Sequence, residues 1–140
     1  MPFLLDTNVV SAARRLKKQA AEFQNFMETF PMNDAFISAV TIMEVQFGIQ
    51  QESKKDPEFA ANLARWLQSH LLVDFSDRIL PFDTAIALRT GTLPTPDKRP
   101  SPDAMIAATA LHHGLTVVTR NISDFEPLGV PCLNPWTFQG

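Results

Sequence analysis

Four carboxylates follow or interrupt apolar segments of this 140-residue chain, namely Asp6, Glu44, Asp103 and Asp124. Asp6 directly follows the apolar run at residues 3–5, and Glu44 has apolar residues on both sides. A buried carboxylate is costly unless it is paired with a cation or hydrogen-bonded. If the fold brings these acids into one cleft they repel one another, and a hard divalent cation such as Mg²⁺ or Mn²⁺ relieves that repulsion. The chemistry expected of such a set is phosphodiester hydrolysis by metal-activated water.

The remaining titratable side chains do not suggest zinc. The chain has one cysteine, Cys132, and three histidines, and their spacing does not match the Cys and His patterns of zinc sites. His112 and His113 directly precede Gly114 at the predicted end of a helix, so we assign them a structural role beside the helix dipole. Asp83 precedes a helical segment, and we interpret it as the cap of that helix.

Composition limits the class of protein. Hydrophobic residues make up 45% of the sequence, the formal net charge is −3 and the isoelectric point is about 5.5, so bulk charge alone would not attract nucleic acid. A single cysteine excludes an internal disulfide and indicates a reducing compartment. The first residues lack a signal-peptide pattern, and no apolar stretch is long enough to span a membrane. We therefore expect a cytoplasmic protein of one domain, residues 1–140, without a membrane segment.

Short apolar runs alternate with helical patterns along the chain. Five runs predict strands, at residues 3–5, 35–38, 79–83, 115–119 and 129–133. Six segments predict helices, at residues 8–15, 23–30, 42–52, 57–71, 84–88 and 102–113. This order predicts an α/β fold with a central parallel sheet of four to five short strands, flanked by helices on both faces. Ligands bind at the carboxyl ends of strands in such sheets, so Asp6 and Asp124 are expected at that edge.

Glu44 and Asp103 belong to predicted helices that begin near the same edge. The residues three and four positions from Glu44 are mostly apolar, so we expect its side chain to point into a cleft, where it needs a cation. Asp103 follows Ser101 and Pro102, a helix cap and a first-turn proline. A carboxylate in the first turn also interacts favourably with the helix dipole, so a purely structural role for Asp103 is an alternative.

Two pairs of basic residues lie close in sequence to the acids. Arg14 and Arg15 end the helix that follows Asp6, and Lys98 and Arg99 belong to a segment with four prolines, residues 92–102. A solvated helix end would explain the arginines, whereas contact with the phosphate backbone of a nucleic acid is the functional interpretation.

Two helices carry stripes of large apolar residues. The stripes are Phe23, Phe26, Met27 and Phe30 on the first, and Phe59, Leu63, Trp66 and Leu67 on the second. Core packing explains part of each, but together they exceed what one sheet face requires. We expect part of them to remain exposed and to form a protein interface.

Four blocks of the sequence, taken in order, resemble the PIN-domain nucleases, and within them the VapC-type toxins of toxin–antitoxin systems, including the FitB-like branch. The blocks are Leu5-Asp6-Thr7-Asn8, Thr41-Ile42-Met43-Glu44, Pro102 to Ala110, and Val118 to Phe125. The segment Leu80-Pro81-Phe82-Asp83 and the ending Asn134-Pro135-Trp136 also resemble that branch. The resemblance therefore extends over essentially the whole chain, although the proline-rich segment before Asp103 is more compact than in many relatives.

This resemblance implies a PIN-like fold and an endoribonuclease that depends on Mg²⁺ or Mn²⁺. It implies that Asp6, Glu44 and Asp103 are the central catalytic and metal-binding acids, with Asp124 as the fourth. Polar positions that orient ligands, water or phosphate in the family correspond to Thr7, Asn8, Thr119 and Asn121. Possible RNA contacts are then Arg14, Arg15, Lys98 and Arg99.

The resemblance also implies partners. They are an RNA substrate, a cognate VapB-like antitoxin that blocks the cleft, and a second copy of the chain in a homodimer, or in a heterotetramer or hetero-octamer with the antitoxin. A PIN-type ribonuclease of RNA processing, without an antitoxin, is the alternative, and a non-catalytic RNA-binding domain would not need all four acids. A phosphatase of the haloacid-dehalogenase type needs a second aspartate where this chain has Asn8.

Overall fold

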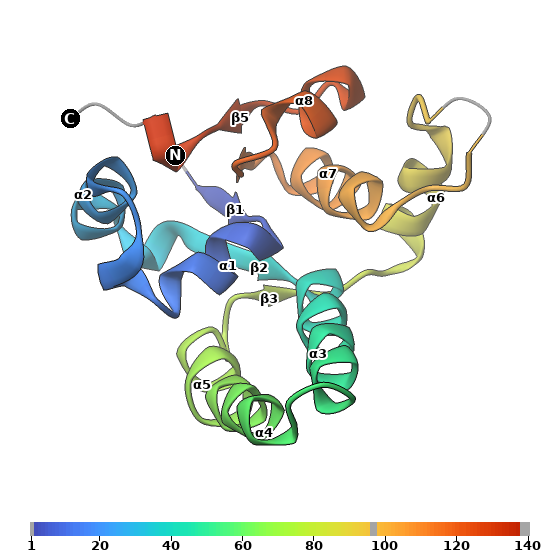
Figure 1. The fold of residues 1–140 in the computed structure, drawn as a ribbon. Coiled ribbons are helices and arrows are strands. Elements are labelled where there is room, and N and C mark those ends of the chain that lie inside the picture. Colours follow the sequence, from blue (N-terminus) through green and yellow to red (C-terminus); the bar gives the residue numbers. More distant parts are fainter. Residues whose placement is uncertain (1, 96–97, 138–140) are drawn as a thin grey trace.

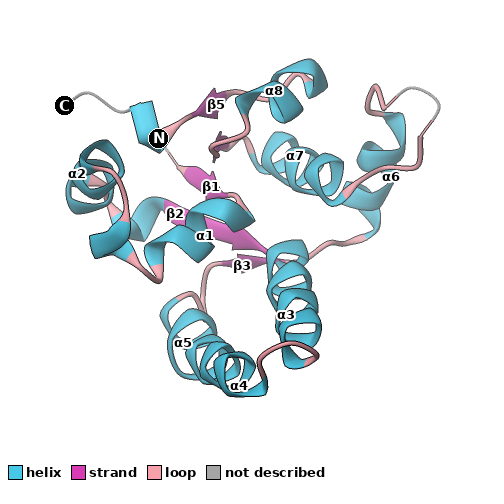
Figure 2. Ribbon diagram, viewed as in Figure 1, coloured by secondary structure: helices cyan, strands magenta, loops and turns pink. Residues whose placement is uncertain are grey.

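The computed structural model describes residues 2–95 and 98–137, so residues 96 and 97 of the predicted proline-rich segment lie outside it. At its centre is a parallel sheet in the strand order β3-β2-β1-β4-β5 (Figure 2). The strands are β1 (Phe3–Leu5), β2 (Ala35–Ser38), β3 (Ile79–Leu80), β4 (Thr116–Val118) and β5 (Cys132–Leu133). Strand β1 lies in the middle, with Leu4 opposite Phe36 of β2 on one side and Val117 of β4 on the other.

Helices connect the strands and cover the sheet. The α-helices are α1 (Thr7–Ala13), α2 (Ala21–Thr29), α3 (Ala39–Ser53), α4 (Pro57–Trp66), α5 (Leu72–Asp74), α6 (Thr84–Thr92), α7 (Pro102–His113) and α8 (Ile122–Phe125). A π-helical segment, η3 (Leu67–Leu71), joins α4 to α5. Short 3-10 turns are η1 (Leu16–Lys18), η2 (Met32–Asp34), η4 (Glu126–Leu128) and η5 (Pro135–Thr137).

The sheet separates two hydrophobic clusters. Successive side chains of a strand point to opposite faces, so Leu5 and Val118 pack with α1, α2 and α4, whereas Leu4 and Val117 pack with α7 and Phe125. Figure 1 shows α2 and α7 on opposite sides of β1, with α3 and α4 as a helical hairpin at the lower edge of the view. The predicted α/β fold with helices on both faces is therefore confirmed.

The helix boundaries differ from the sequence prediction at several places: α1 ends at Ala13 rather than residue 15, α2 begins at Ala21 rather than residue 23, and α6 ends at Thr92 rather than residue 88. Helix α3 begins at Ala39 rather than residue 42, because the Ser38 side chain accepts a hydrogen bond from the Val40 N–H at 3.0 Å and caps the helix. The predicted helix at 57–71 continues through the π-helical segment into α5. None of the helices in the described part of the chain is long and apolar enough to cross a membrane.

The three phenylalanines of the first apolar stripe belong to the core, whereas its fourth member, Met27, is half-buried and lines a cavity. Phe23 is 0% exposed, Phe26 is 3% and Phe30 is 9%. Phe23 stacks on Trp136, with 4.4 Å between the ring centroids, and Phe30 packs on Phe3 of β1. Phe3 of β1 and Trp136 of η5 thus cover the apolar face of α2, for which the sequence predicted no packing partner.

Candidate active site

Asp6 lies at the carboxyl end of the central strand and begins α1. Its side chain is only 4% exposed, and its two oxygens each accept a hydrogen bond at 2.8 Å, from the Thr7 N–H and from the Thr119 hydroxyl. The Asp6 N–H donates to the Val118 carbonyl, which continues the pairing of β1 with β4. The carboxylate is therefore fixed by the first turn of α1 on one side and by the end of β4 on the other.

Glu44 lies in α3 and is held from α1. The Thr7 hydroxyl donates to Glu44 Oε1 at 2.5 Å, and the Thr7 and Thr41 hydroxyl oxygens are 3.1 Å apart. Thr41 is fully buried, and the sequence did not single it out as a site residue. Glu44 itself is half-buried and lines a groove, which agrees with the expectation that its side chain points into a cleft.

Asp103 and Asp124 reach the same region from the other face of the sheet. Asp103 is in the first turn of α7, which Ser101 caps by accepting from the Ala104 N–H at 3.2 Å. Asp124 is exposed and belongs to the short helix α8, which follows β4. Electrostatic repulsion couples Asp103 to both Asp6 and Asp124, and couples Asp6 to Glu44 and Asp124. The fold thus collects four acids from four separate segments of the chain.

Two of these acids resist ionisation. Burial raises the pKa of Asp6, and repulsion from Glu44 and Asp124 adds to this, although the hydrogen bonds from Thr119 and Thr7 oppose the shift. Burial also raises the pKa of Asp103, and repulsion from Asp6 and Asp124 adds to it. A cation placed among the acids would reverse both effects.

Thr119 is the polar residue that links β4 to the site. Besides donating to Asp6, its hydroxyl oxygen lies 3.4 Å from the Asn8 side-chain nitrogen and accepts from the Asn121 N–H at 3.0 Å. Asn8 Oδ1 also accepts from the Arg120 N–H at 3.4 Å. The side chains of Thr7, Asn8 and Thr119 are thereby brought together, whereas Asn121 joins through its backbone.

The acids suit a hydrated divalent cation better than a closed protein cage. All of the donors are carboxylate oxygens, and Asp6 uses each oxygen for one hydrogen bond, which leaves lone pairs available. Among the described residues, no group of three or more His, Cys, Asp or Glu side chains lies close enough together to hold a metal ion, so the protein would supply only one or two of its ligands directly. Mg²⁺ commonly keeps several waters and binds one or two carboxylates, so this donor set fits it.

Of the four predicted RNA contacts, only one pair lies beside this site. The guanidinium carbons of Arg14 and Arg15 lie 5.4 and 5.5 Å from the centre of the Phe59 ring. Arg14 also lines a cavity of about 300 Å³ that begins at Thr7 and Glu44. Lys98 and Arg99 are exposed, and in the described part of the chain their side chains form no hydrogen bond or ion pair with the acids.

Acidic side chains at the carboxyl edge of a parallel sheet lie where proteins of this architecture bind their ligands. The chain belongs to the PIN-domain family, whose model matches residues 3–126.

Its relatives in that family are toxins and ribonucleases. It is 32% identical to toxin FitB of Neisseria gonorrhoeae, with 95% of this chain and 97% of FitB covered. It is 30% identical to VapC ribonuclease Y4jK of Sinorhizobium fredii, with 95% and 96% covered.

Solved structures agree in fold. The FitAcB structure from N. gonorrhoeae matches with a TM-score of 0.81 at 32% identity, covering 97% of this chain and 99% of that one. A toxin–antitoxin complex from Klebsiella pneumoniae matches with a TM-score of 0.62 at 30% identity, covering 95% and 97%. The resemblance inferred from the sequence blocks is therefore confirmed.

Proposed function

We propose that this chain is the toxin of a toxin–antitoxin pair, a single PIN domain over residues 1–140 that hydrolyses RNA with Mg²⁺ or Mn²⁺. The observation that carries this proposal is the buried Asp6 carboxylate at the carboxyl edge of the sheet, which interacts electrostatically with Glu44, Asp103 and Asp124. The names of the relatives, a toxin and a VapC ribonuclease at about one-third identity, support the same activity.

The bound cation would supply Lewis-acid activation of water and neutralise charge on the phosphodiester. Asp6 and Asp103, with Glu44 and Asp124, are the residues that would hold it. Thr7 donates a hydrogen bond to Glu44 Oε1, which orients this carboxylate and leaves its other oxygen free to hold the cation. The Thr119 hydroxyl keeps Asp6 oriented, so this side chain loses little rotamer entropy when it binds an ion.

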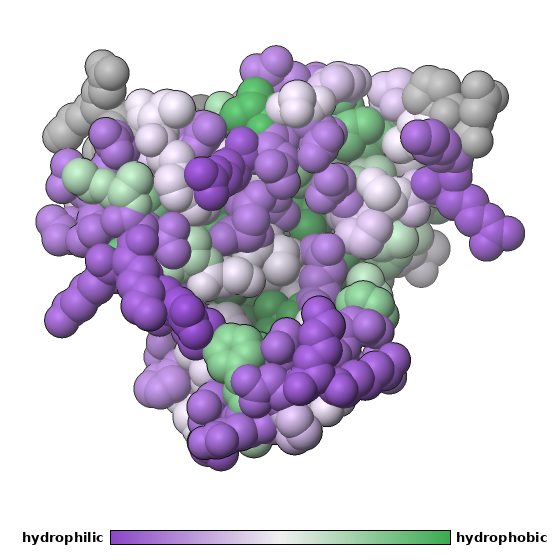
Figure 3. All heavy atoms as spheres, viewed as in Figure 1, coloured by the Kyte–Doolittle hydropathy of each residue, from purple (hydrophilic) through white to green (hydrophobic). Residues whose placement is uncertain are grey.

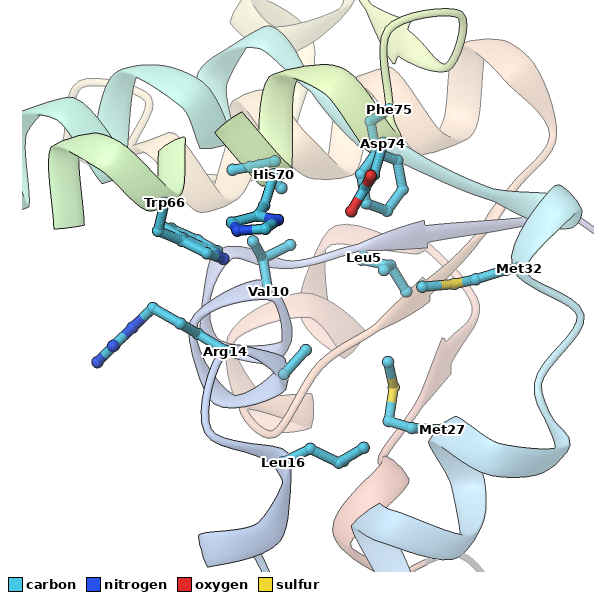
Figure 4. A pocket seen from close by; sticks show the side chains of 12 residues that line it. Leu5, Val10, Arg14, Leu16, Met27, Met32, Trp66, His70, Asp74 and Phe75 are labelled. Carbon is cyan, nitrogen blue, oxygen red and sulfur yellow. The ribbon is translucent and has the colours of Figure 1, made fainter. Parts of the chain in front are cut away.

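An antitoxin is the expected protein partner. A largely apolar cavity of about 330 Å³ shares Arg14 and Trp66 with the groove at Glu44. In it Trp66 and His70 of the α4–α5 segment lie close to Val10 of α1, and Met27 of α2 lines another part of the wall (Figure 4). Apolar side chains of an antitoxin segment would fill it, and a basic residue of the same segment would enter the acid cluster and compete with the metal. We expect the toxin to form a homodimer, alone or within a larger complex with its antitoxin, in the cytoplasm where RNA is available.

The test is cleavage of total RNA by the purified chain with mapping of the new ends. With Mg²⁺ or Mn²⁺ we expect defined cleavage sites, and Asp6→Asn should lower the rate about a hundredfold or more, because an amide is a poor ligand for a hard cation. Full activity of Asp6→Asn, or of the parent in excess EDTA, would refute the metal mechanism. The chain is also co-expressed with the product of the adjacent reading frame. If that product does not inhibit RNA cleavage, the RNA-processing alternative is favoured.

A further inference from the structure

A groove leads away from the acids between three helices. It is the cavity of about 300 Å³ that Arg14 lines, and we call it the helix groove. Its defining residues are Thr7 and Arg14 of α1 and its end, Glu44 and Gly48 of α3, and Phe59 and Trp66 of α4. Figure 3 shows apolar atoms recessed between polar side chains at the centre of this face, below α1 and above the α3–α4 hairpin. Thr7 donates to Glu44 at the inner end, so the groove and the acidic site are continuous.

Two cations lie together at the groove. Arg14 and Arg15 both lie over the Phe59 ring, and within the described part of the chain neither forms an ion pair, since the one such pair joins Arg78 to Asp77. Burial lowers the pKa of Arg14, and repulsion from Arg15 lowers it further. An anion such as a phosphate group would offset this repulsion and accept several hydrogen bonds from the paired guanidinium groups.

The second observation concerns Gly48, whose presence in a helix is not explained by the fold of the chain. It lies within the fifteen-residue helix α3, where glycine costs roughly 1 kcal/mol relative to alanine. Its φ is not positive, and a Cβ built at this position would meet nothing within 4 Å. Neither the backbone nor packing among the described residues requires glycine here. A glycine also permits the close approach of a ligand, and the position lies on the wall of the helix groove.

The opposite wall is apolar. Leu63 and Trp66 line it, and Trp66 is half-buried, so its ring is held in place by the protein. Aromatic side chains of this kind bind unstacked bases, and single-stranded RNA offers such bases. Glu52 at the far end of α3 would repel a phosphate, which favours a phosphate position at Arg14 instead.

From these features we infer that the helix groove binds one nucleotide of single-stranded RNA beside the scissile bond, with its phosphate on Arg14 and Arg15 and its base against Leu63 and Trp66. This inference rests on the proposed ribonuclease function and adds a substrate subsite to it. The groove would then select for unpaired RNA next to the cleavage point, because a base held in a duplex cannot enter it.

The first test measures RNA binding without cleavage. In an Asp6→Asn background, the affinity for a short fluorescent single-stranded RNA is measured by anisotropy over a range of salt concentrations. The double variant Arg14→Gln/Arg15→Gln should bind more weakly and reduce the slope of log K against log salt by about 0.7 for each phosphate that is no longer neutralised. The control Lys17→Gln/Lys18→Gln removes the same charge from the adjacent turn η1, which does not line the groove. Equal effects of the two double variants would overturn the inference.

The second test fills the groove without removing a charge. Gly48→Leu should lower kcat/KM on an RNA oligonucleotide by about tenfold more than on bis(p-nitrophenyl) phosphate, since the stacking of one base is abolished. Gly91→Leu is the matched control, an exposed glycine of α6 whose added Cβ also meets nothing within 4 Å. If Gly48→Leu lowers kcat/KM equally on both substrates, the proposed subsite is overturned. It is also overturned if Gly48→Leu weakens antitoxin binding and leaves both kcat/KM values unchanged. If the parent chain cleaves no RNA with either metal, the proposed function fails, while the binding test still decides the groove.

Discussion

At the scale of single residues, the site is defined by carboxylates that the fold keeps together at a cost. Asp6 is buried beside Glu44 and Asp124, and its pKa is raised above the ordinary aspartate value of 3.8, chiefly by burial. The folded state therefore keeps this proton at pH values where the unfolded chain has lost it. The stability gained from protonation is present below about pH 3.8 and is lost as the pH rises through the folded-state pKa.

Asp6→Asn should therefore stabilise the metal-free protein at neutral pH. Asparagine is as good a helix cap as aspartate and removes the repulsion, so the melting temperature should rise, by about 2–8 °C for each kcal/mol relieved. The gain should shrink as the pH falls towards 3.8, and thermal denaturation at a series of pH values in EDTA measures it. The control is Asp83→Asn, because Asp83 also caps a helix, α6, by accepting from the Ile86 N–H at 2.9 Å, but is exposed. An equal rise in melting temperature for Asp6→Asn and Asp83→Asn would show that relief of the buried, repelled Asp6 charge is not the cause.

At the scale of elements, two helices present acids to the site from opposite faces of the sheet. Helix α7 is rich in small residues, and its positions Ala104, Ala107, Ala108 and Ala110 are all 0% exposed. It packs closely on the sheet, so the place where its first turn begins determines the position of Asp103. Helix α3 likewise depends on its Ser38 cap to place Glu44.

Ser101→Ala should destabilise the protein and loosen Asp103. Losing the hydrogen bond to the Ala104 N–H should cost about 0.5–2 kcal/mol of unfolding free energy, measured by urea denaturation. Ser101→Gly is the control, because replacing a serine cap by glycine lowers the unfolding free energy by only a few tenths of a kcal/mol relative to the parent. Indistinguishable urea midpoints for Ser101→Ala and the parent would show that the cap does not hold the first turn of α7.

The sequence predicts these elements well because each has a local signal. Ser101 and Pro102 indicate a helix start, Gly114 has the positive φ of 68° expected after a helix end, and the β-branched run at β4 predicts a strand. The burial of the Phe23 stripe could not be predicted, because its partner Trp136 lies over a hundred residues away in the chain. The same holds for the pairing of Thr119 with Asp6 and of Thr41 with Thr7, in which each contact depends on the completed sheet.

At the scale of the whole molecule, metal binding should stabilise the fold. Because the repelling acids come together only in the folded state, Mg²⁺ should raise the melting temperature, with about 2.7 kcal/mol gained at a hundred times its Kd. Sodium chloride at matched ionic strength is the control for screening. The Asp6→Asn variant should lose most of the effect. A parent protein whose melting temperature does not respond to millimolar Mg²⁺ at neutral pH would argue against a shared site.

Antitoxin binding should also be visible across the molecule. Hydrogen exchange of the co-expressed complex, compared with the isolated chain, should show protection in α1 and α4 around the apolar cavity that includes Trp66 and Met27. Protection confined to α6, on the other face of the sheet, would contradict this placement, and that helix serves as the internal reference.

The position of β1 has a consequence for how the protein is made. Asp6 leaves the ribosome more than a hundred residues before its hydrogen-bond partner Thr119 and the fourth acid Asp124. At about 5–20 residues per second, translation needs about 6–24 s to pass from one to the other. During that interval the nascent toxin has no assembled site, so the growing polypeptide cannot attack the messenger that encodes it before Thr119 and Asp124 have emerged.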